Sequence, residues 1–301
     1  MAQERSWKYV LLLTFTALIW GVAFVAQSEG SAYMRSSTFM GIRFLIAAAA
    51  LLPVIFAKRN RAADRRGLWR AGIICGTFLG VASLLQQEAI TQGASAGKAG
   101  FITATYIVIV PILNRLIFRK KVAAATWFGV AAALAGLYLL CMKEASMSLR
   151  MSDILLILCA FGYSLQILAI DRFSPRYDAV ELSAIQFLAC GTIGIVLMPF
   201  VDIAPVGLAA WAAPMASWKA WLPLLYAAIL SSAVGYTLQT VGQKGLNPTV
   251  ASLLMSLESV FAALAGWVIL RQSLSSRELW GCALVFAAVV LAQLPGRRTR
   301  S

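Results

Sequence analysis

The stretch FMGIRFL at residues 39–45 returns in altered form as LSAIQFL at residues 182–188. This offset of 143 residues places Arg43 on Gln186 and Phe44 on Phe187. Past the first charged loop the offset becomes 152, and the matched pairs include Trp69 with Trp221, Gln87 with Gln239, Gly93 with Gly245 and Arg119 with Arg271. Self-similarity along the whole chain indicates two copies of one structural unit. We therefore predict two units, residues 1–146 and 147–301.

The composition places both units in a membrane. Hydrophobic residues make up 60% of the chain, charged residues 13%, and the mean hydropathy is +0.80. A span needs about 20 mostly apolar residues, and lipid offers no partner for unpaired backbone groups, so each span must be helical. The sequence predicts an all-α polytopic membrane protein with ten transmembrane helices. These are expected at 8–27, 37–57, 71–90, 97–118, 124–142, 153–170, 182–200, 220–242, 249–270 and 279–294.

The distribution of basic residues predicts the orientation. Of the 26 Lys and Arg residues, seventeen fall on the side of the N-terminus and seven on the opposite side, with two inside spans. Basic residues concentrate in cytoplasmic loops, so both termini are expected in the cytoplasm. Because each unit has five spans, an odd number, the second enters the membrane from the opposite face. The sequence thus predicts two inverted five-helix repeats, an arrangement typical of secondary transporters.

Several other classes of protein are disfavoured. The chain has no histidine, which excludes Ser-His-Asp and Cys-His centres and His-ligated metal sites. The five cysteines lack the spacing of a metal or redox motif, so no metal and no cofactor is expected. The net charge of +14 is carried mainly by loops between hydrophobic stretches, where it sets topology and contacts lipid headgroups, so no nucleic-acid partner is expected.

Four stretches of sequence carry a family resemblance. They are Trp20-Gly21, the FxxxRF pattern at 39–44, SAGKAGFITATYIVIVP at 95–111 and SLESVFAALAGW at 256–267. In this order and spacing the chain resembles the EamA-like branch of the drug/metabolite transporter superfamily. The resemblance implies an inner-membrane carrier, usually an exporter of amino acids, metabolites or toxic organic compounds. It also implies a cavity lined by the first four helices of each repeat, with the fifth and tenth helices peripheral.

Two charged residues inside predicted spans are the first candidates for function. Intramembrane charges face protein or water rather than lipid. Glu258 lies about ten residues into the ninth span, near the middle of the bilayer, where it could exchange a proton or meet a cationic group. Arg43 could orient a carboxylate. Alternatively, Arg43 neutralises Glu258 or Glu88 and the pair is structural.

Further candidates come from repeat-equivalent polar positions and from aromatic residues. Gln87 and Gln239 match each other, Arg43 matches Gln186, and Tyr106 matches Glu258. Glu88 adds a second carboxyl group near Gln87. Aromatic walls around an amphipathic or cationic solute are expected from Trp20, Tyr106, Tyr163 and Tyr236. The alternatives are interhelical hydrogen bonding for the polar residues and ordinary packing for the aromatic ones.

The functional prediction combines these observations. We expect a secondary-active transporter in the cell membrane that exports a small organic solute by alternating access, with proton coupling through Glu258 as a further hypothesis. The solute is an amino acid, a metabolite or an amphipathic amine, and membrane lipid is the surrounding partner. A passive facilitator or channel is the alternative, followed by a membrane-embedded enzyme. We expect no enzymatic activity.

Overall fold

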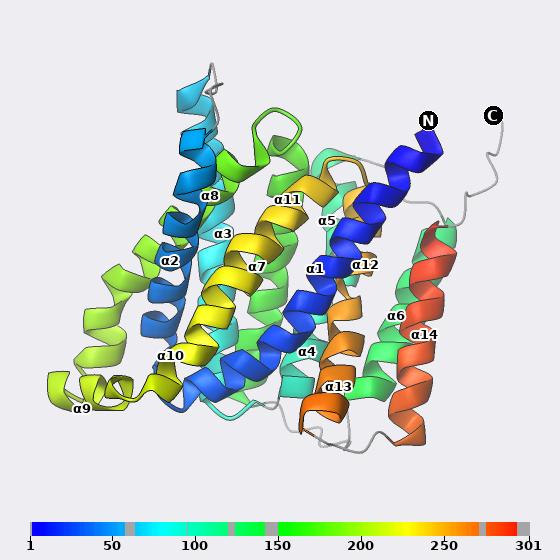
Figure 1. The fold of residues 1–301 in the computed structure, drawn as a ribbon. Coiled ribbons are helices and arrows are strands. Elements are labelled where there is room, and N and C mark those ends of the chain that lie inside the picture. Colours follow the sequence, from blue (N-terminus) through cyan, green and yellow to red (C-terminus); the bar gives the residue numbers. More distant parts are fainter. Residues whose placement is uncertain are drawn as a thin grey trace.

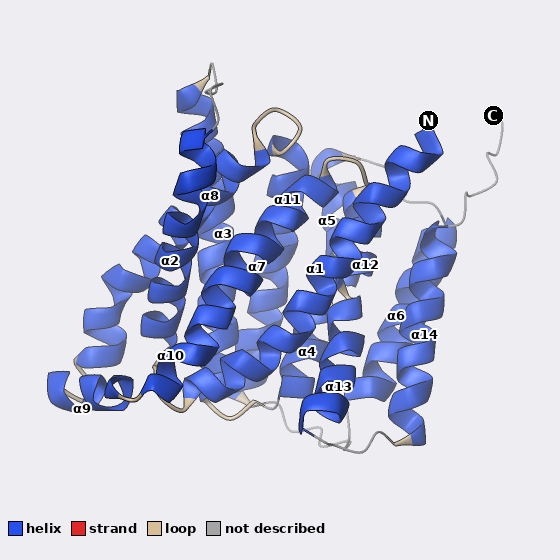
Figure 2. Ribbon diagram, in the orientation of Figure 1, coloured by secondary structure: helices blue, strands red, loops and turns tan. Residues whose placement is uncertain are grey.

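Helices account for all of the regular secondary structure in the part of the chain that the computed structural model describes (Figure 2). The described residues are 2–57, 64–94, 96–119, 124–141, 150–270 and 275–293. The predicted boundary between the two units, at residues 146 and 147, lies outside them, as do the predicted helix ends at 142 and 294. The all-helical fold that the composition predicts is confirmed.

The first repeat contains five helical segments, of which the fourth is divided into two helices. Their bounds are α1 (Ala2–Ser31), α2 (Ser36–Ala57), α3 (Arg65–Thr91), α4 (Ala96–Ala104) with α5 (Tyr106–Phe118), and α6 (Ala124–Cys141). We call the side on which α1 begins the amino-terminal face and the other side the opposite face. The carboxyl-terminal end of α14 lies at the amino-terminal face as well (Figure 1).

The second repeat has the same order but more interruptions. Its five segments are α7 (Met151–Phe173), α8 (Ala179–Met198) with the π-helical turn η1 (Pro199–Ile203), α10 (Trp218–Leu225) with η3 (Tyr226–Tyr236) and α11 (Thr237–Gln243), α12 (Pro248–Met255) with α13 (Leu257–Leu270), and α14 (Ser276–Gln293). The change of offset from 143 to 152 means that the second repeat has nine extra residues, and the short helices α9 (Leu208–Ala212) and η2 (Ala213–Ala216) lie in the stretch between its second and third segments.

The lengths of these segments fit a bilayer. Eight of them are long and apolar enough to cross a membrane, and the other two are α6, with its apolar stretch Thr126–Leu140, and α14. α6 and α14 pack on each other at one side of the molecule, as expected for peripheral fifth and tenth helices (Figure 1). The prediction of an all-helical protein with many membrane spans is therefore confirmed, with eight clear spans among the ten predicted, and helices four and nine are broken rather than continuous.

The packing of the helices has the symmetry expected of inverted repeats. α3 packs on α7 and α8, and the equivalent segment η3–α11 packs on α1 and, through η3, on α2. α1 contacts α12 and α13, and its counterpart α7 contacts α4 and α5. Exchange of the two repeats thus converts one set of helix contacts into the other. The remaining large contacts, α2 with α8 and α6 with α14, join equivalent helices and lie on the pseudo-two-fold axis.

Equivalent residues meet close to this axis. The rings of Phe44 and Phe187 are both fully buried and their centroids are 5.9 Å apart. Both belong to the main hydrophobic core, which extends through most of the helices. This pair corresponds to the FMGIRFL and LSAIQFL stretches, so the repeat seen in the sequence forms the centre of the contact between α2 and α8.

Glycines set the closest helix contacts. A Cβ atom at Gly76 would clash with the backbone oxygen of Gln186, and one at Gly72 would lie 2.5 Å from Ile185, so α3 approaches α8 along a glycine face. A Cβ atom at Gly21 would lie 2.7 Å from the backbone oxygen of Glu258. Gly21 thus allows α1 to pack directly against the turn of α13 that carries Glu258, which is a structural reason for the Trp20-Gly21 pair.

Candidate functional site

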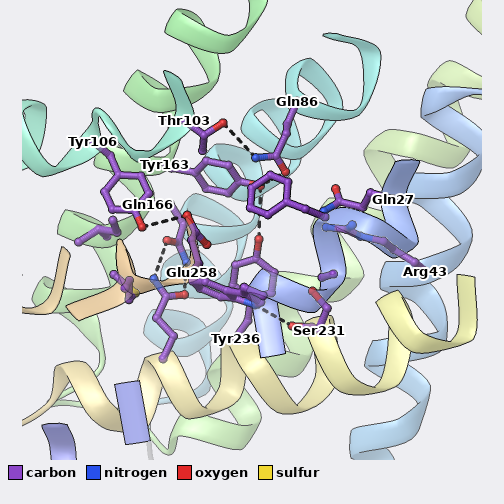
Figure 3. Close-up of a pocket in the computed structure, with 16 residues that line it drawn as sticks. Gln27, Arg43, Gln86, Thr103, Tyr106, Tyr163, Gln166, Ser231, Tyr236 and Glu258 are labelled. Carbon is purple, nitrogen blue, oxygen red and sulfur yellow. Dashed lines mark hydrogen bonds between the residues drawn. The ribbon is translucent and has the colours of Figure 1, made fainter. Parts of the chain in front are cut away.

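A small cavity lined by polar, aromatic and aliphatic side chains lies between the two repeats near the middle of the helices. Its volume is about 40 Å³, which holds a few water molecules. Seven of the ten candidate residues line it, namely Trp20, Arg43, Tyr106, Tyr163, Tyr236, Gln239 and Glu258. Figure 3 shows the labelled side chains of this set, from Arg43 and Tyr106 of the first repeat to Tyr163, Tyr236 and Glu258 of the second, around the cavity. An organic solute would require the lining side chains to move apart, because the cavity is smaller than such a molecule.

Breaks in two equivalent helices bring Tyr106 and Glu258 together. Helix four is interrupted at Thr105, between α4 and α5, and helix nine at Ser256, between α12 and α13. Tyr106 and Glu258 follow these breaks and are repeat equivalents. The Tyr106 hydroxyl donates a hydrogen bond to Glu258 Oε1 at 3.1 Å. Interrupted helices at the middle of the membrane form the substrate and ion sites of many transporters, so the breaks mark this contact as a candidate centre.

Glu258 and Arg43 share the cavity but do not form an ion pair with each other. Glu258 is 5% exposed and Arg43 is 3% exposed. Among the described residues, no nitrogen of Arg43 lies within 4.0 Å of a carboxylate oxygen, and Arg43 Nε has no hydrogen-bond partner. The two labelled side chains occupy separate places in Figure 3. The described structure thus contains no ion pair between Arg43 and Glu258.

Arg43 contacts aromatic rings instead. Its guanidinium carbon lies 4.5 Å from the centroid of the Phe44 ring and 5.9 Å from that of Phe39. Cation–π contacts of this kind stabilise a desolvated cation by about 2 kcal/mol. They leave the planar donors of the guanidinium group available, because aromatic faces accept no conventional hydrogen bond. A carboxylate in the cavity would be a suitable acceptor for these donors.

Aromatic side chains form one wall of the cavity. The rings of Trp20 and Tyr236 are 4.6 Å apart at their centroids, and Trp20 Nε1 donates to the backbone oxygen of Ser231 at 3.1 Å. Ser231 lies in η3, where the π-helical winding differs from that of the equivalent helix α3. The Tyr236 hydroxyl donates to the Tyr163 hydroxyl at 3.4 Å. π-Helical turns often occur at functional sites, and here the turn positions the indole of Trp20.

Glutamine amides form another wall of the cavity. One of these residues, Gln166, was not among the candidates predicted from the sequence. Gln166 and Gln239 exchange two hydrogen bonds, of 3.3 and 3.1 Å. Gln166 Nε2 also donates to Gln186 Oε1 at 3.2 Å, which places Gln186 behind the cavity wall. Gln166 is a polar residue within a predicted span, and this signal could have identified it. Its repeat equivalent is Ala23, so the search for symmetric polar pairs missed it.

Gln87 and Glu88 do not line the cavity. Gln87 Nε2 donates to the backbone oxygen of Gln27 at 3.3 Å. Glu88 accepts hydrogen bonds from Ser36 Oγ at 2.6 Å and from Gln92 Nε2 at 3.0 Å, so it links α2 to the end of α3. The neighbouring Gln86 lines the cavity instead and donates to Thr103 Oγ1 at 3.1 Å. A polar run in a helix turns by about 100° per residue, and only one member of this run faces the cavity.

Among the described residues, no group of His, Cys, Asp or Glu side chains is arranged to hold a metal ion. The polar groups of the cavity are amides, hydroxyls, one carboxyl and one guanidinium group. This set suits the recognition of a polar organic molecule.

Comparison with known proteins identifies the family. A model of the EamA-like transporter family matches residues 7–142 and again residues 150–294. The chain belongs to the EamA-like transporter family. It is thereby a multi-pass membrane protein of a transporter family, not of an enzyme family, and part of the drug/metabolite transporter superfamily. The two matched segments also agree with the duplication seen in the sequence.

Individual relatives extend over nearly the whole EamA-like chain. An "uncharacterized transporter" of Archaeoglobus fulgidus is 28% identical over 285 residues, which cover 94% of this chain and 84% of the relative. The "uncharacterized inner membrane transporter YedA" of Escherichia coli K12 is 24% identical over 92% of this chain and 88% of its own. A solved crystal structure matches with a TM-score of 0.77 at 18% identity, covering 98% of this chain and 99% of the other. The last likeness shows the fold alone.

Proposed function

We propose that this EamA-like chain is a secondary-active transporter that moves a small organic solute by alternating access. The inverted helix packing supports the mechanism, because exchange of conformation between two equivalent repeats alternately opens a central site to the two faces. The cavity between the repeats is the site at which the solute would be held. We further propose that the physiological direction is export, as the family resemblance implies.

The observation that carries the proposal is the separation of the two buried charges. Arg43 and Glu258 line one cavity without an ion pair between them. A buried charge without a charged partner is costly. A solute that has both a carboxylate and an ammonium group would satisfy both residues at once. This argument favours amino acids over amines without a carboxylate, and the rings of Trp20 and Tyr236 would contact the rest of the solute.

Proton coupling through Glu258 follows from the same geometry. In the empty site a proton on Glu258 would remove its charge, and a cationic group of the solute would replace that proton on binding. Proton and solute would then compete for one carboxyl group, which is a simple basis for exchange between them. The hydroxyl of Tyr106 would stay bonded to Glu258 in the charged form, because a carboxylate accepts its hydrogen bond.

We propose the cell (inner) membrane as the location, with both termini in the cytoplasm. The excess of basic residues on the amino-terminal face supports the orientation. The name of the Escherichia coli relative YedA includes the inner membrane, which supports the location. In this orientation Arg43 lies toward the outer side of the membrane and Glu258 close to its middle.

Counterflow in proteoliposomes tests the proposal. Purified protein is loaded with unlabelled amino acid, and uptake of the labelled amino acid is followed with and without an imposed pH gradient, for the unmodified chain and Glu258→Gln. We expect saturable exchange, driven by the gradient only when Glu258 is present. Glu29→Gln is a matched control, because Glu29 is an exposed carboxylate at the opposite face.

Three results would count against parts of the proposal. Flux that does not saturate would indicate a passive facilitator or channel. Saturable flux that responds to neither the gradient nor Glu258→Gln would make Glu258 structural. Saturable exchange of amines but not of amino acids would contradict the paired-charge argument while leaving the carrier intact.

A further inference from the structure

A second, larger hollow lies between helix ends and is lined by a different set of residues from the central cavity. It is a groove of about 620 Å³ between α2, the start of α3 and the start of α8. These three helix ends lie at the amino-terminal face (Figure 1). The groove shares no lining residue with the central cavity. It is therefore a separate feature, and the transport proposal does not use it.

The groove exists because glycines close only one half of the contact between α2 and α8. Gly41 meets Gly194 so closely that a Cβ atom on Gly194 would lie 2.6 Å from the Cα atom of Gly41, and Gly191 similarly meets Leu45. At the repeat offset of 143, the position equivalent to Gly194 is Leu51, and the position equivalent to Gly191 is Ala48. These larger residues keep the helices apart in the half nearer the amino-terminal face, so the groove is encoded in the sequence.

The walls of the groove are apolar and face the lipid. Phe56 is 73% exposed, and Leu52, Trp69 and Leu188 are also exposed. In a bilayer such a surface is covered by acyl chains, and an unfilled hollow would lose the dispersion contacts of its lining. Trp69 lies at the helix end, where aromatic residues commonly mark the headgroup region. A lipid chain is thus the occupant for which the walls are suited.

Charged residues at the mouth of the groove would select among lipid headgroups. Two of its lining residues are charged, Arg65 at the start of α3 and Glu181 in the first turn of α8. No ion pair joins Arg65 to Glu181 in the described part of the chain. A guanidinium group is well matched to a phosphate, and a carboxylate accepts hydrogen bonds from a primary ammonium group. Both charges would be satisfied by one zwitterionic headgroup.

We propose that this groove is a binding site for phosphatidylethanolamine, with its phosphate on Arg65, its ammonium group near Glu181 and an acyl chain between α2 and α8. Phosphatidylglycerol is expected to bind less well, because it has no ammonium group for Glu181 and its negative phosphate would lie close to this carboxylate. The quaternary ammonium group of phosphatidylcholine has no N–H donor. The neighbouring Arg66 and Arg70 are exposed and do not line the groove, so the anionic lipids that they attract are not held within it.

Competition among lipids tests the site on the full-length protein. The protein is purified in detergent, equilibrated with an equimolar mixture of phosphatidylethanolamine, phosphatidylglycerol and phosphatidylcholine, and analysed by native mass spectrometry for retained lipid. We expect phosphatidylethanolamine to be enriched over both others. The expected preference is about two- to fivefold, the range that a partly exposed charge contact provides.

Variants distinguish the two headgroup contacts. Glu181→Gln should remove the preference over phosphatidylglycerol, and Arg65→Gln should lower the retention of both phosphatidylethanolamine and phosphatidylglycerol. Arg115→Gln, an exposed arginine on α5, and Glu29→Gln are matched controls that should behave like the unmodified protein. Ala184→Trp should fill the groove and lower retention of phosphatidylethanolamine, and its circular dichroism spectrum checks that it folds.

Three outcomes would overturn the proposal. The first is equal retention of the three lipids by the unmodified protein, which would mean an unselective lipid surface. The second is a preference for phosphatidylglycerol, which would mean that lipid selectivity depends on the basic residues alone and not on the pair of opposite charges. The third is that Arg65→Gln and Glu181→Gln both behave like the controls. The readout is lipid binding alone, so it is independent of whether transport is observed.

Discussion

The two ends of the molecule use equivalent helices but hold them together differently. At the opposite face, Lys98 at the start of α4 pairs with Asp153 at the start of α7, with Nζ to Oδ1 at 2.6 Å and Nζ to Oδ2 at 2.8 Å. At the amino-terminal face the repeat equivalents of these residues are Val250 on α12 and Val10 on α1, and both pack in the main hydrophobic core. An ion pair at one end is thus replaced by apolar packing at the other.

The two repeats also differ in their charged residues at the centre of the molecule. Arg43 in the first repeat corresponds to Gln186 in the second, and Tyr106 corresponds to Glu258. Inverted repeats therefore share the arrangement of their helices, while their charges differ. An ion pair is directional and weakened by salt, whereas apolar packing is neither. We expect the two faces to open at different energetic cost, and the following predictions test that difference.

The largest effect is expected from Arg43→Gln, which gives the first repeat the residue that the second repeat has at this position. Removal of one partner of a desolvated charge contact costs about 2–5 kcal/mol, so counterflow of an amino acid should fall by about 30-fold or more. Exchange of an amine without a carboxylate should be much less affected. Arg277→Gln, at the start of α14, serves as control. An equal loss for both solutes would mean that Arg43 stabilises the fold rather than the bound carboxylate.

A smaller effect is expected from breaking the ion pair at the opposite face. Lys98→Met and Asp153→Asn should each lower the free energy of unfolding by about 1–3 kcal/mol, because each leaves a charged or polar partner unsatisfied. The double variant should lose less than the sum of the two single losses. Thermal unfolding in detergent measures all four proteins. High salt should destabilise the unmodified protein more than Lys98→Met, and strictly additive losses would show that the two residues do not interact.

Tyr106→Phe tests the contact between the broken helices. The variant keeps the ring and removes the hydrogen bond to Glu258, which contributes about 0.5–1.5 kcal/mol for a typical hydrogen bond. The apparent affinity for the solute or for protons should change by about two- to tenfold, as measured by counterflow over a range of pH values. Tyr138→Phe, on the lipid-exposed side of α6, is the matched control. If the two variants behave identically, the Tyr106 hydroxyl has no role in binding the solute or protons.

The smallest effect concerns a hydrogen bond that exists only at the amino-terminal face. The backbone N–H of Gly67 and the hydroxyl of Tyr177 donate to the Asp64 carboxylate at 2.8 and 3.1 Å, and they hold the pKa of Asp64 below its ordinary value. The repeat equivalents of Asp64 and Tyr177 are Ala216 and Met34, which cannot form this contact. Tyr177→Phe should raise the Asp64 pKa toward that of a free aspartate, as measured by carboxyl NMR.

The sign of the pH dependence follows from the direction of this shift. Because the folded-state pKa of Asp64 is lowered, its contribution to stability is present above the unfolded-state pKa and is lost as the pH falls through the folded-state value. In Tyr177→Phe part of this acid-sensitive contribution should disappear. An unchanged Asp64 titration in the variant would mean that the N–H of Gly67 alone determines it.

Much of the candidate site could be predicted because it consists of polar residues in apolar spans. Glu258, Arg43 and Tyr106 stand out in this way, and the repeat offset pairs Tyr106 with Glu258, which the structure joins by a hydrogen bond. Gln86 could not be distinguished from Gln87, because neighbouring residues on a helix point in directions about 100° apart and the rotation of α3 is set by its packing. Gln166 was missed because its repeat equivalent is an alanine.

The sequence by itself determined the membrane location, the helical nature of the spans, their duplication and the inversion of the second copy. These follow from hydropathy, from the offset between matched residues and from the odd number of spans, and none of them depends on how the helices touch. The tertiary structure alone decided the breaks at Thr105 and Ser256, the separation of Arg43 from Glu258 and the groove beside α2. The physical reason is that helix rotation and close approach depend on packing between residues far apart in the chain, such as Gly21 against α13 and Gly41 against Gly194.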